Sequence, residues 1–132
     1  MITDNHPVSE LTRESFAASV DGHPFAVVDF WAPWCGPCRA FAPVFAAAAA
    51  RHPGALFAKV NTEEEQQLAA YFRIRSIPTL MIFRNNIVVF AQAGALSAAA
   101  LDQVLAAAKE LDMDAVRREV AGETGEAPAA NA

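Results

Sequence analysis

The sequence predicts an α/β domain in which a central mixed β-sheet is flanked by helices on both faces. Its 132 residues amount to about one domain, because single cores usually contain roughly 100–200 residues. Apolar runs rich in β-branched and aromatic residues alternate with helical patterns, which is typical of parallel strands joined by helices. Two late apolar runs are separated by a segment too short for a crossover helix, so they add antiparallel strands.

The first elements follow from short local patterns. Val8–Leu11 is a weakly strand-like segment, and Thr12 can cap a helix in which Phe16 and Val20 recur at helical spacing. We expect this helix to end near Gly22. The first part of the chain therefore predicts a short strand followed by an amphipathic helix.

The next run predicts the central strand. Phe25–Trp31 is apolar almost throughout and favours a strand buried on both faces, as the strands of parallel sheets are. Its one charge is Asp29, and a carboxylate in a buried strand requires an explanation. After segment 32–38, apolar spacing predicts a helix to about Arg51, with Pro43 inside it.

The second half continues the alternation and then changes to a hairpin. Leu56–Val60 predicts a strand, and Thr62–Glu65 has the pattern of a capping box that begins a helix ending near 71–72. Thr79–Phe83 and Ile87–Phe90 predict an antiparallel hairpin, whose turn contains two asparagines that tolerate positive φ.

The last elements define the expected domain boundaries. Ser97 caps an alanine-rich helix with an apolar stripe, and Met113–Val120 adds one or two helical turns. The stripe consists of Leu101, Val104, Leu105 and Leu111. The remaining residues are small and polar and include proline, which predicts disorder. We therefore divide the chain into a domain at 1–111, a helical extension at 112–121 and a disordered tail at 122–132.

Composition excludes several classes of protein. Ten Lys and Arg against fifteen Asp and Glu give a net charge of −5, so no broad basic surface is available for nucleic acid. No apolar run approaches the roughly 20 residues that cross a bilayer, so we expect no contact with a membrane. Residues 1–7 lack the basic and apolar regions of a secretory signal, which makes the cytoplasm the expected compartment.

Both cysteines of the chain lie in one Cys-x-x-Cys motif, at the expected start of a helix and the carboxyl end of a central strand. Helical neighbours three apart have Cβ atoms roughly 5–6 Å apart, and a disulfide needs Cα atoms about 4.4–6.8 Å apart. Unpaired N–H groups at a helix start favour the thiolate of Cys35, and the N–H of Cys38 can point at its sulfur. Since the thiolate attacks in disulfide exchange, we expect Cys35 to attack and Cys38 to resolve the mixed disulfide.

Other interpretations of the motif are open at this point. A structural disulfide between residues three apart would close a very small loop and stabilise the fold little. A zinc site needs more ligands, and His6, His23 and His52 lack the paired spacing, although a cluster shared between two chains also fits. A redox-inert domain that only binds partners is the remaining interpretation.

The longer segment Trp31–Arg39, Trp-Ala-Pro-Trp-Cys-Gly-Pro-Cys-Arg, resembles the active-site segment of the thioredoxin family. The resemblance extends over roughly Val8–Leu111. Phe41–Pro43, Val60–Glu63 and Ile74–Thr79 are most similar to the bacterial second thioredoxin subfamily. That subfamily often carries an amino-terminal zinc-binding cysteine module, which has no counterpart in this sequence.

The resemblance implies a thioredoxin fold and a protein-disulfide reductase that performs dithiol–disulfide exchange. It implies a monomer that binds no metal and needs no cofactor beyond the redox-active disulfide Cys35–Cys38. The implied partners are disulfide-containing client proteins and an NADPH-dependent thioredoxin reductase. Gly36 and Pro37 form the reducing version of the motif, which favours a reductase over a disulfide oxidase or isomerase. The non-enzymatic alternative is a holdase or an assembly subunit.

The resemblance also implies roles for residues around the thiols. Asp29 is implied to lie beneath the second cysteine with Lys59 nearby, where burial raises its pKa unless Lys59 compensates, and to accept the Cys38 proton. Pro78 is implied to be cis and to face the cysteines, with the Ile77 backbone pairing with an extended substrate segment. The implied docking surface consists of Trp34, Gly36, Pro37, Thr62, Ala93, Gly94 and Ala95.

Two positions depart from the family pattern. Arg73 stands where the family has a glycine after the third helix, and a left-handed cap there would be strained by about 1 kcal/mol. Asn86 replaces the usual hairpin glycine. Neither departure involves the cysteines.

Overall fold

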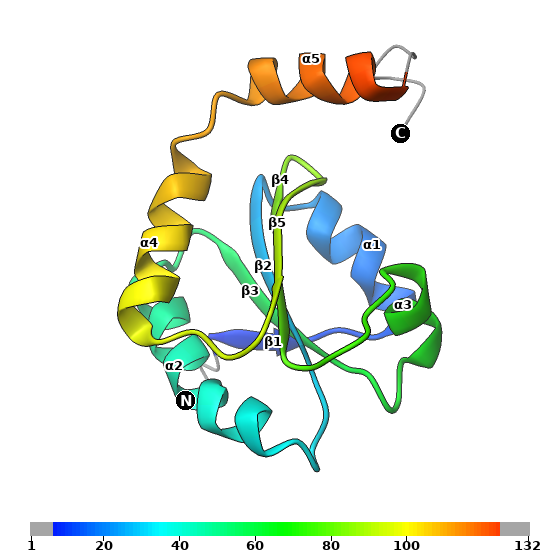
Figure 1. Cartoon of the computed structure of the whole chain (residues 1–132), viewed down its shortest axis with the longest axis vertical. Helices are drawn as coiled ribbons and strands as arrows, with labels where there is room; N and C mark the ends of the chain where they lie inside the picture. Colours follow the sequence, from blue (N-terminus) through cyan, green and yellow to red (C-terminus); the bar gives the residue numbers. More distant parts are fainter. Residues whose placement is uncertain (1–6, 125–132) are drawn as a thin grey trace.

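A computed structural model of the chain describes residues 7–124, and its core is one mixed five-stranded sheet (Figure 1). The strand order is β1-β3-β2-β4-β5. The strands are β1 (Val8–Glu10), β2 (Phe25–Trp31), β3 (Leu56–Asn61), β4 (Thr79–Arg84) and β5 (Ile87–Ala93). The first three pair in parallel, and β4 and β5 add antiparallel pairs, so the predicted mixed sheet is confirmed.

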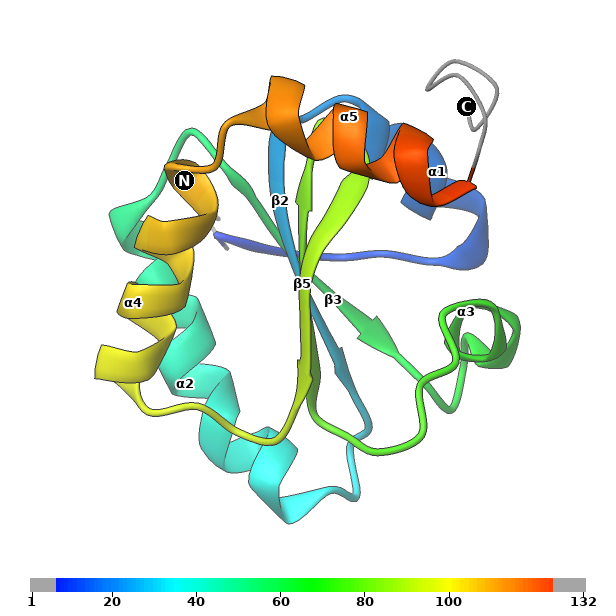
Figure 2. The ribbon, with the colours of Figure 1, turned by 45° about the horizontal axis from the view of Figure 1, so that its top comes forward.

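Helices cover both faces of the sheet, as the sequence predicts (Figure 2). They are α1 (Arg13–Asp21), α2 (Gly36–Arg51), α3 (Gln66–Tyr71) and α4 (Ala98–Lys109). The α1 and α3 helices pack with Val28 and Phe30 of β2, whereas α2 and α4 pack with Val27. Because strand side chains alternate between faces, Asp29 lies on the same face as Val27, beneath α2.

The two local signals at helix starts have different outcomes. Thr12 caps α1 as predicted, in a capping box that it completes with Ser15. The predicted capping box at Thr62–Glu65 is wrong, because the helix begins at Gln66 and no side chain caps it.

Two hydrogen-bonding arrangements explain why the chain does not become helical at Thr62. The Asn61 carboxamide oxygen accepts the backbone N–H groups of Glu63 and Glu64, at 2.9 and 3.4 Å, and folds this segment into a turn. The backbone N–H and the hydroxyl of Thr62 both donate to the Trp31 carbonyl oxygen, at 2.8 and 3.0 Å. The Thr62 side chain is therefore tied to the end of β2 and does not cap a helix.

Several turns use positive φ. Asn85 and Asn86 turn the hairpin with φ of 52° and 66°, which confirms the prediction from their residue type. Arg73 has φ of 57°, so the cap at this position is left-handed although it has no glycine. Strand β5 is longer than predicted and reaches Ala93, which pairs with Thr79 although its exposed end has little apolar pattern.

The carboxyl-terminal part differs from the sequence prediction in two ways. Ser97 caps α4 as expected, accepting the N–H of Ala100 at 3.1 Å. Leu111 is not part of the helical stripe, because α4 ends at Lys109 and 39% of Leu111 is exposed. A further helix, α5 (Met113–Thr124), is longer than the one or two turns predicted and lies across the hairpin end of the sheet (Figure 1).

The expected domain boundaries are only partly within the described chain. Helix α5 extends three residues into the segment 122–132 that the sequence predicts to be disordered. Residues 1–6 and 125–132 of the expected domain and tail lie outside the described residues. In the part of the chain that the structure describes, no helix has the length and apolar character required to cross a bilayer.

Candidate active site

The two cysteines form a disulfide at the start of α2. Their Cα atoms are 5.2 Å apart, inside the range that the sequence spacing predicts. Cys35 is the N-cap of α2, and its sulfur accepts the backbone N–H of Cys38 at 3.2 Å. The helix start therefore directs a hydrogen-bond donor at the Cys35 sulfur, which is the arrangement that stabilises a thiolate when the pair is reduced.

The disulfide lies at the carboxyl edge of the parallel strands and is buried by the residues around it. Only 4% of Cys35 and 2% of Cys38 are exposed, and Ala32, Trp31 and Ile77 pack around them. Another molecule can therefore reach these sulfur atoms only by docking closely on this edge.

Two loops far apart in the sequence meet beside the disulfide. The carbonyl oxygen of Ile77 lies 3.7 Å from the Cys35 sulfur, and the Ile77–Pro78 peptide bond is cis, as the resemblance implies. Gly94 donates its N–H to the Pro78 carbonyl oxygen at 2.8 Å. Gly94 has φ of 107°, a conformation that favours glycine, so this residue type fits the turn that brings the two loops together.

The residues of the implied docking surface lie around this centre. Gly36 and Pro37 are exposed in the first turn of α2, and 65% of Trp34 is exposed. The residues 93–95 are exposed at the end of β5 and in the loop that follows. Thr62 is half-buried and fixed to the end of β2. Hydrogen bonds to Pro78 and Trp31 tie Gly94 and Thr62 to the centre, whereas Ala95 is placed there only by its position in the loop.

Asp29 is a buried carboxyl group on the α2 face of the central strand. Only 4% of it is exposed, and its Oδ1 atom has no hydrogen-bond partner among the described residues. Burial raises the pKa of Asp29 to about 7, while the charge of Lys59 lowers it. The sequence-based expectations of burial and of a raised pKa are confirmed.

Lys59 compensates only in part, because its charge lowers the pKa of Asp29 by less than burial raises it. Lys59 lies opposite Asp29 in the register of β2 and β3. Its Nζ lies 4.7 Å from the centre of the Trp31 ring, in a cation–π contact. Among residues 7–124, no ion pair within 4.0 Å joins Lys59 to Asp29. The carboxyl group therefore keeps a high proton affinity despite a neighbouring cation.

Three residues that shape the site were not among the predicted site residues. Glu63 accepts the indole N–H of Trp34, Asn61 folds the turn that places Glu63, and Trp31 carries the Lys59 contact. The position of Asn61 directly after the predicted strand Leu56–Val60 is the one local signal for such a turn. Glu63 and Trp31 act through contacts with distant residues, which the sequence pattern does not encode.

Within residues 7–124, no three His, Cys, Asp or Glu side chains are grouped as a metal ion would require. The two cysteines are joined to each other.

A cysteine pair that caps a helix and closes to a disulfide can exchange that disulfide with those of other molecules, which makes this protein a thiol–disulfide oxidoreductase. Comparison with known proteins narrows the class. The family model described as Thioredoxin matches residues 7–107, and the chain belongs to the thioredoxin family.

Individual relatives agree with this assignment. A Streptomyces coelicolor protein that carries the name thioredoxin 2 is 51% identical over 118 residues, which cover 89% of this chain and 88% of that protein. Thioredoxin 1 of a Nostoc species is 44% identical over 99 residues, covering 74% and 92%. The structure of a mutant thioredoxin from Halobacterium salinarum superposes with a TM-score of 0.74 at 27% identity, covering 84% of this chain and 99% of that one. The predicted thioredoxin fold is confirmed.

Proposed function

We propose that the protein is a protein-disulfide reductase that uses Cys35 to attack client disulfides and Cys38 to resolve the intermediate. The observation that carries the proposal is the hydrogen bond from the Cys38 N–H to the Cys35 sulfur, at the start of α2. It favours negative charge on Cys35, and the thiolate is the nucleophile in disulfide exchange.

The proposed exchange between the cysteine pair and a client disulfide has two steps. The Cys35 thiolate attacks one sulfur of the client disulfide, forming a mixed disulfide and releasing the first client thiolate. The Cys38 thiolate then attacks the Cys35 sulfur, releasing the second client thiolate and leaving the Cys35–Cys38 disulfide. Two electrons pass to the client, and a thioredoxin reductase that uses NADPH returns two electrons to the cysteine pair.

Asp29 is proposed to accept the Cys38 proton through a water molecule before the second step. Its place on the α2 face of β2 and its burial support this role. With a pKa of about 7, the carboxyl group exchanges its proton near neutral pH, which suits a general base. Lys59 is proposed to adjust this pKa, since its charge opposes the effect of burial.

Client recognition is proposed to use the backbone beside the disulfide. Ile77 presents its backbone next to Cys35, where an extended client segment can pair with it as an added strand. The residues of the surrounding surface are uncharged, and among the described residues the one charged group bonded to them is Glu63, which accepts the Trp34 indole N–H. The members of this surface are Trp34, Gly36, Pro37, Thr62, Ala93, Gly94 and Ala95.

The proposed compartment and redox partner follow from the need to keep the cysteine pair reduced. A reductase has to be kept reduced, so we propose that it works in the cytoplasm beside an NADPH-dependent thioredoxin reductase. It acts as a monomer with no bound cofactor, because the electrons are carried by Cys35 and Cys38 themselves.

Reduction of insulin disulfides, coupled to NADPH oxidation through an added bacterial thioredoxin reductase, tests the proposal. We expect NADPH consumption that depends on the wild-type protein and is absent with Cys35→Ser. Failure to reduce insulin from NADPH or from dithiothreitol, in a folded protein, would contradict the proposal. Efficient transfer of the Cys35–Cys38 disulfide from the oxidised protein to a reduced client, without NADPH or dithiothreitol, would instead indicate an oxidase.

A further inference from the structure

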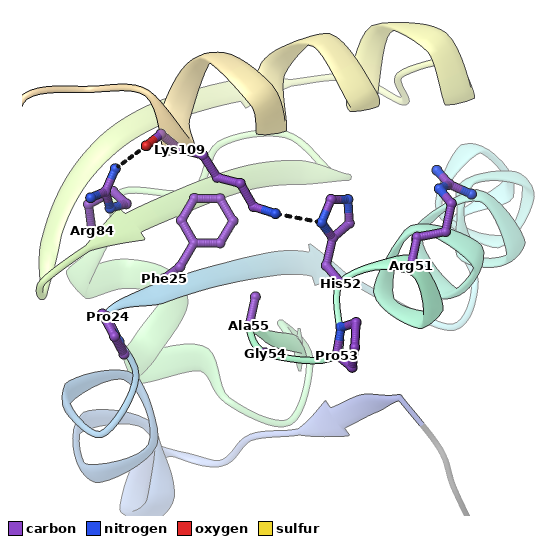
Figure 3. Close-up of a pocket in the computed structure, with 9 residues that line it drawn as sticks. All are labelled: Pro24, Phe25, Arg51, His52, Pro53, Gly54, Ala55, Arg84 and Lys109. Carbon is purple, nitrogen blue, oxygen red and sulfur yellow. Dashed lines mark hydrogen bonds between the residues drawn. The ribbon is translucent and has the colours of Figure 1, made fainter.

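A second concave site lies at the end of the sheet opposite the disulfide. It is a pocket of about 510 Å³ between the start of β2, the loop after α2, the end of β4 and the end of α4 (Figure 3). Strand β2 separates it from the cysteine motif, since Phe25 lines the pocket and Trp31, roughly 20 Å further along, leads to Cys35. The pocket therefore does not belong to the disulfide site.

The pocket, which we name the basic pocket, concentrates positive charge in an acidic protein. Arg51, Arg84 and Lys109 line it together with His52, and among the described residues no Asp or Glu lines it. Asp102 lies outside the lining and pairs with Arg51 at 2.7 Å, which neutralises that one cation. The chain as a whole has a net charge of −5, so this local excess of cations differs from the composition of the chain.

The polar groups in the basic pocket are arranged as donors. The Lys109 ammonium lies 2.8 Å from His52 Nδ1, and since an ammonium can only donate, Nδ1 accepts. The proton of neutral His52 is then on Nε2, which makes that nitrogen a donor as well. The pKa of His52 is lowered mainly by burial, and further by the charges of Lys109 and Arg51, while the charge of Asp102 raises it. The ring is therefore neutral at pH 7.

Arg84 is held in place by two hydrogen bonds and has further N–H groups that these two bonds do not use. Its Nη1 atom donates to the carbonyl oxygens of Ala108 and Lys109 at the end of α4, at 2.6 and 3.1 Å. A guanidinium has five N–H donors, and two bonds through Nη1 leave those on Nη2 and Nε. The helix end thus holds Arg84 at the pocket with a planar donor fork, the group that binds phosphate with two parallel hydrogen bonds.

We propose that the basic pocket binds the phosphate group of a small organic phosphate. Arg84 supplies donors and charge on one side of the Phe25 ring, and Lys109 and His52 supply them on the other (Figure 3). Pro24, Phe25 and Pro53 supply an apolar wall for the organic part. The volume lies within the roughly 300–1,000 Å³ of small-molecule sites and exceeds what a bare phosphate ion needs.

Titration calorimetry of the full-length oxidised protein with ADP, inorganic phosphate and adenosine tests this site, independently of disulfide reduction. We expect ADP to bind more tightly than inorganic phosphate, and adenosine, which lacks phosphate, not to bind. Raising the salt concentration should weaken ADP binding, because the contacts are between charges.

Substitutions locate the binding. Lys109→Gln and Arg84→Gln should each weaken ADP binding at least about tenfold, as expected for loss of a charge-assisted hydrogen bond. Lys109→Gln leaves the Arg84 contacts at the end of α4 in place, so it serves if Arg84→Gln fails to fold. Arg75→Gln is the matched control, because it removes the same charge from an exposed loop outside the basic pocket.

Three results would overturn the proposal. They are no ADP binding at millimolar concentration, equal binding of ADP by the wild-type protein and both pocket variants, and ADP binding no tighter than inorganic phosphate. The last result would mean that the site recognises a free anion and has no role for an organic part.

Discussion

Replacing Asp29 by alanine should stabilise the protein at neutral pH, although it removes a buried side chain. The carboxyl group is buried without a hydrogen-bond partner for Oδ1, and its pKa is raised from 3.8 to about 7. Between these two pH values the unfolded chain loses the Asp29 proton while the folded chain retains it. The folded state therefore loses stability relative to the unfolded state as the pH rises through this window.

The size of the effect follows from the width of that window. Each pH unit between 3.8 and about 7 costs about 1.4 kcal/mol, so the penalty reaches about 4 kcal/mol and stays constant above the folded pKa. Removing the carboxyl group leaves a small cavity, which costs about 1 kcal/mol at every pH. The Asp29→Ala protein should thus be less stable than wild type near pH 4 and as stable as wild type at about pH 4.5. At pH 8 its free energy of unfolding should exceed that of wild type by about 3 kcal/mol.

Urea unfolding of the oxidised proteins at pH 4, 5, 6, 7 and 8 measures this difference. Asp21→Ala, which removes an exposed carboxylate at the end of α1, controls for the change in net charge. The predicted cost of burying Asp29 is wrong if Asp29→Ala is the less stable protein at pH 7, or if its stability relative to wild type does not change between pH 4 and 7.

The same variant should resolve mixed disulfides more slowly than wild type. A wild-type rate of client reduction would remove Asp29 from the proposed mechanism.

Two further predictions concern the tail and the Gly94 turn. Truncation after Ala121 should leave insulin reduction and the melting temperature unchanged, because the removed residues are too polar to bury much apolar surface. A large loss of activity or of melting temperature would show that the tail docks on the domain. Gly94→Ala should lower the free energy of unfolding by about 1–2 kcal/mol in a urea titration, since φ of 107° strains an alanine although nothing lies within 4 Å of its Cβ. An unchanged urea midpoint would show that the turn relaxes at no cost.

The elements with local signals were predictable from the sequence. Phe25–Trp31 is apolar on both faces because it is the central strand between β3 and β4, and its one carboxylate is buried as expected. Asn85 and Asn86 turn the hairpin, and Ser97 caps α4, through bonds and dihedral angles within a few residues. The cysteine spacing likewise determines their distance once α2 begins at Gly36.

Features that depend on distant contacts were not predictable. Thr62 matches a helix cap by pattern, yet its hydroxyl bonds to the Trp31 carbonyl, a partner 31 positions away. The apolar stripe predicts a longer α4, yet Arg84 of β4 donates to the carbonyls at its last turn, and Leu111 lies beyond it. The basic pocket combines four separate segments of the chain, so its charge cluster is visible only in the folded structure.

Trapping mixed disulfides with single-cysteine variants tests whether Cys35 attacks the client and Cys38 resolves the intermediate. Reduced Cys38→Ser and Cys35→Ser proteins are mixed with an oxidised client and analysed on non-reducing gels and by intact mass. The account predicts that Cys38→Ser forms a stable adduct joined through Cys35, because no thiol remains to release the client. Cys35→Ser should form none, since the hydrogen bond that favours a thiolate is directed at the Cys35 sulfur, which this variant lacks. Equal trapping by both variants, or trapping by Cys35→Ser alone, would contradict the account.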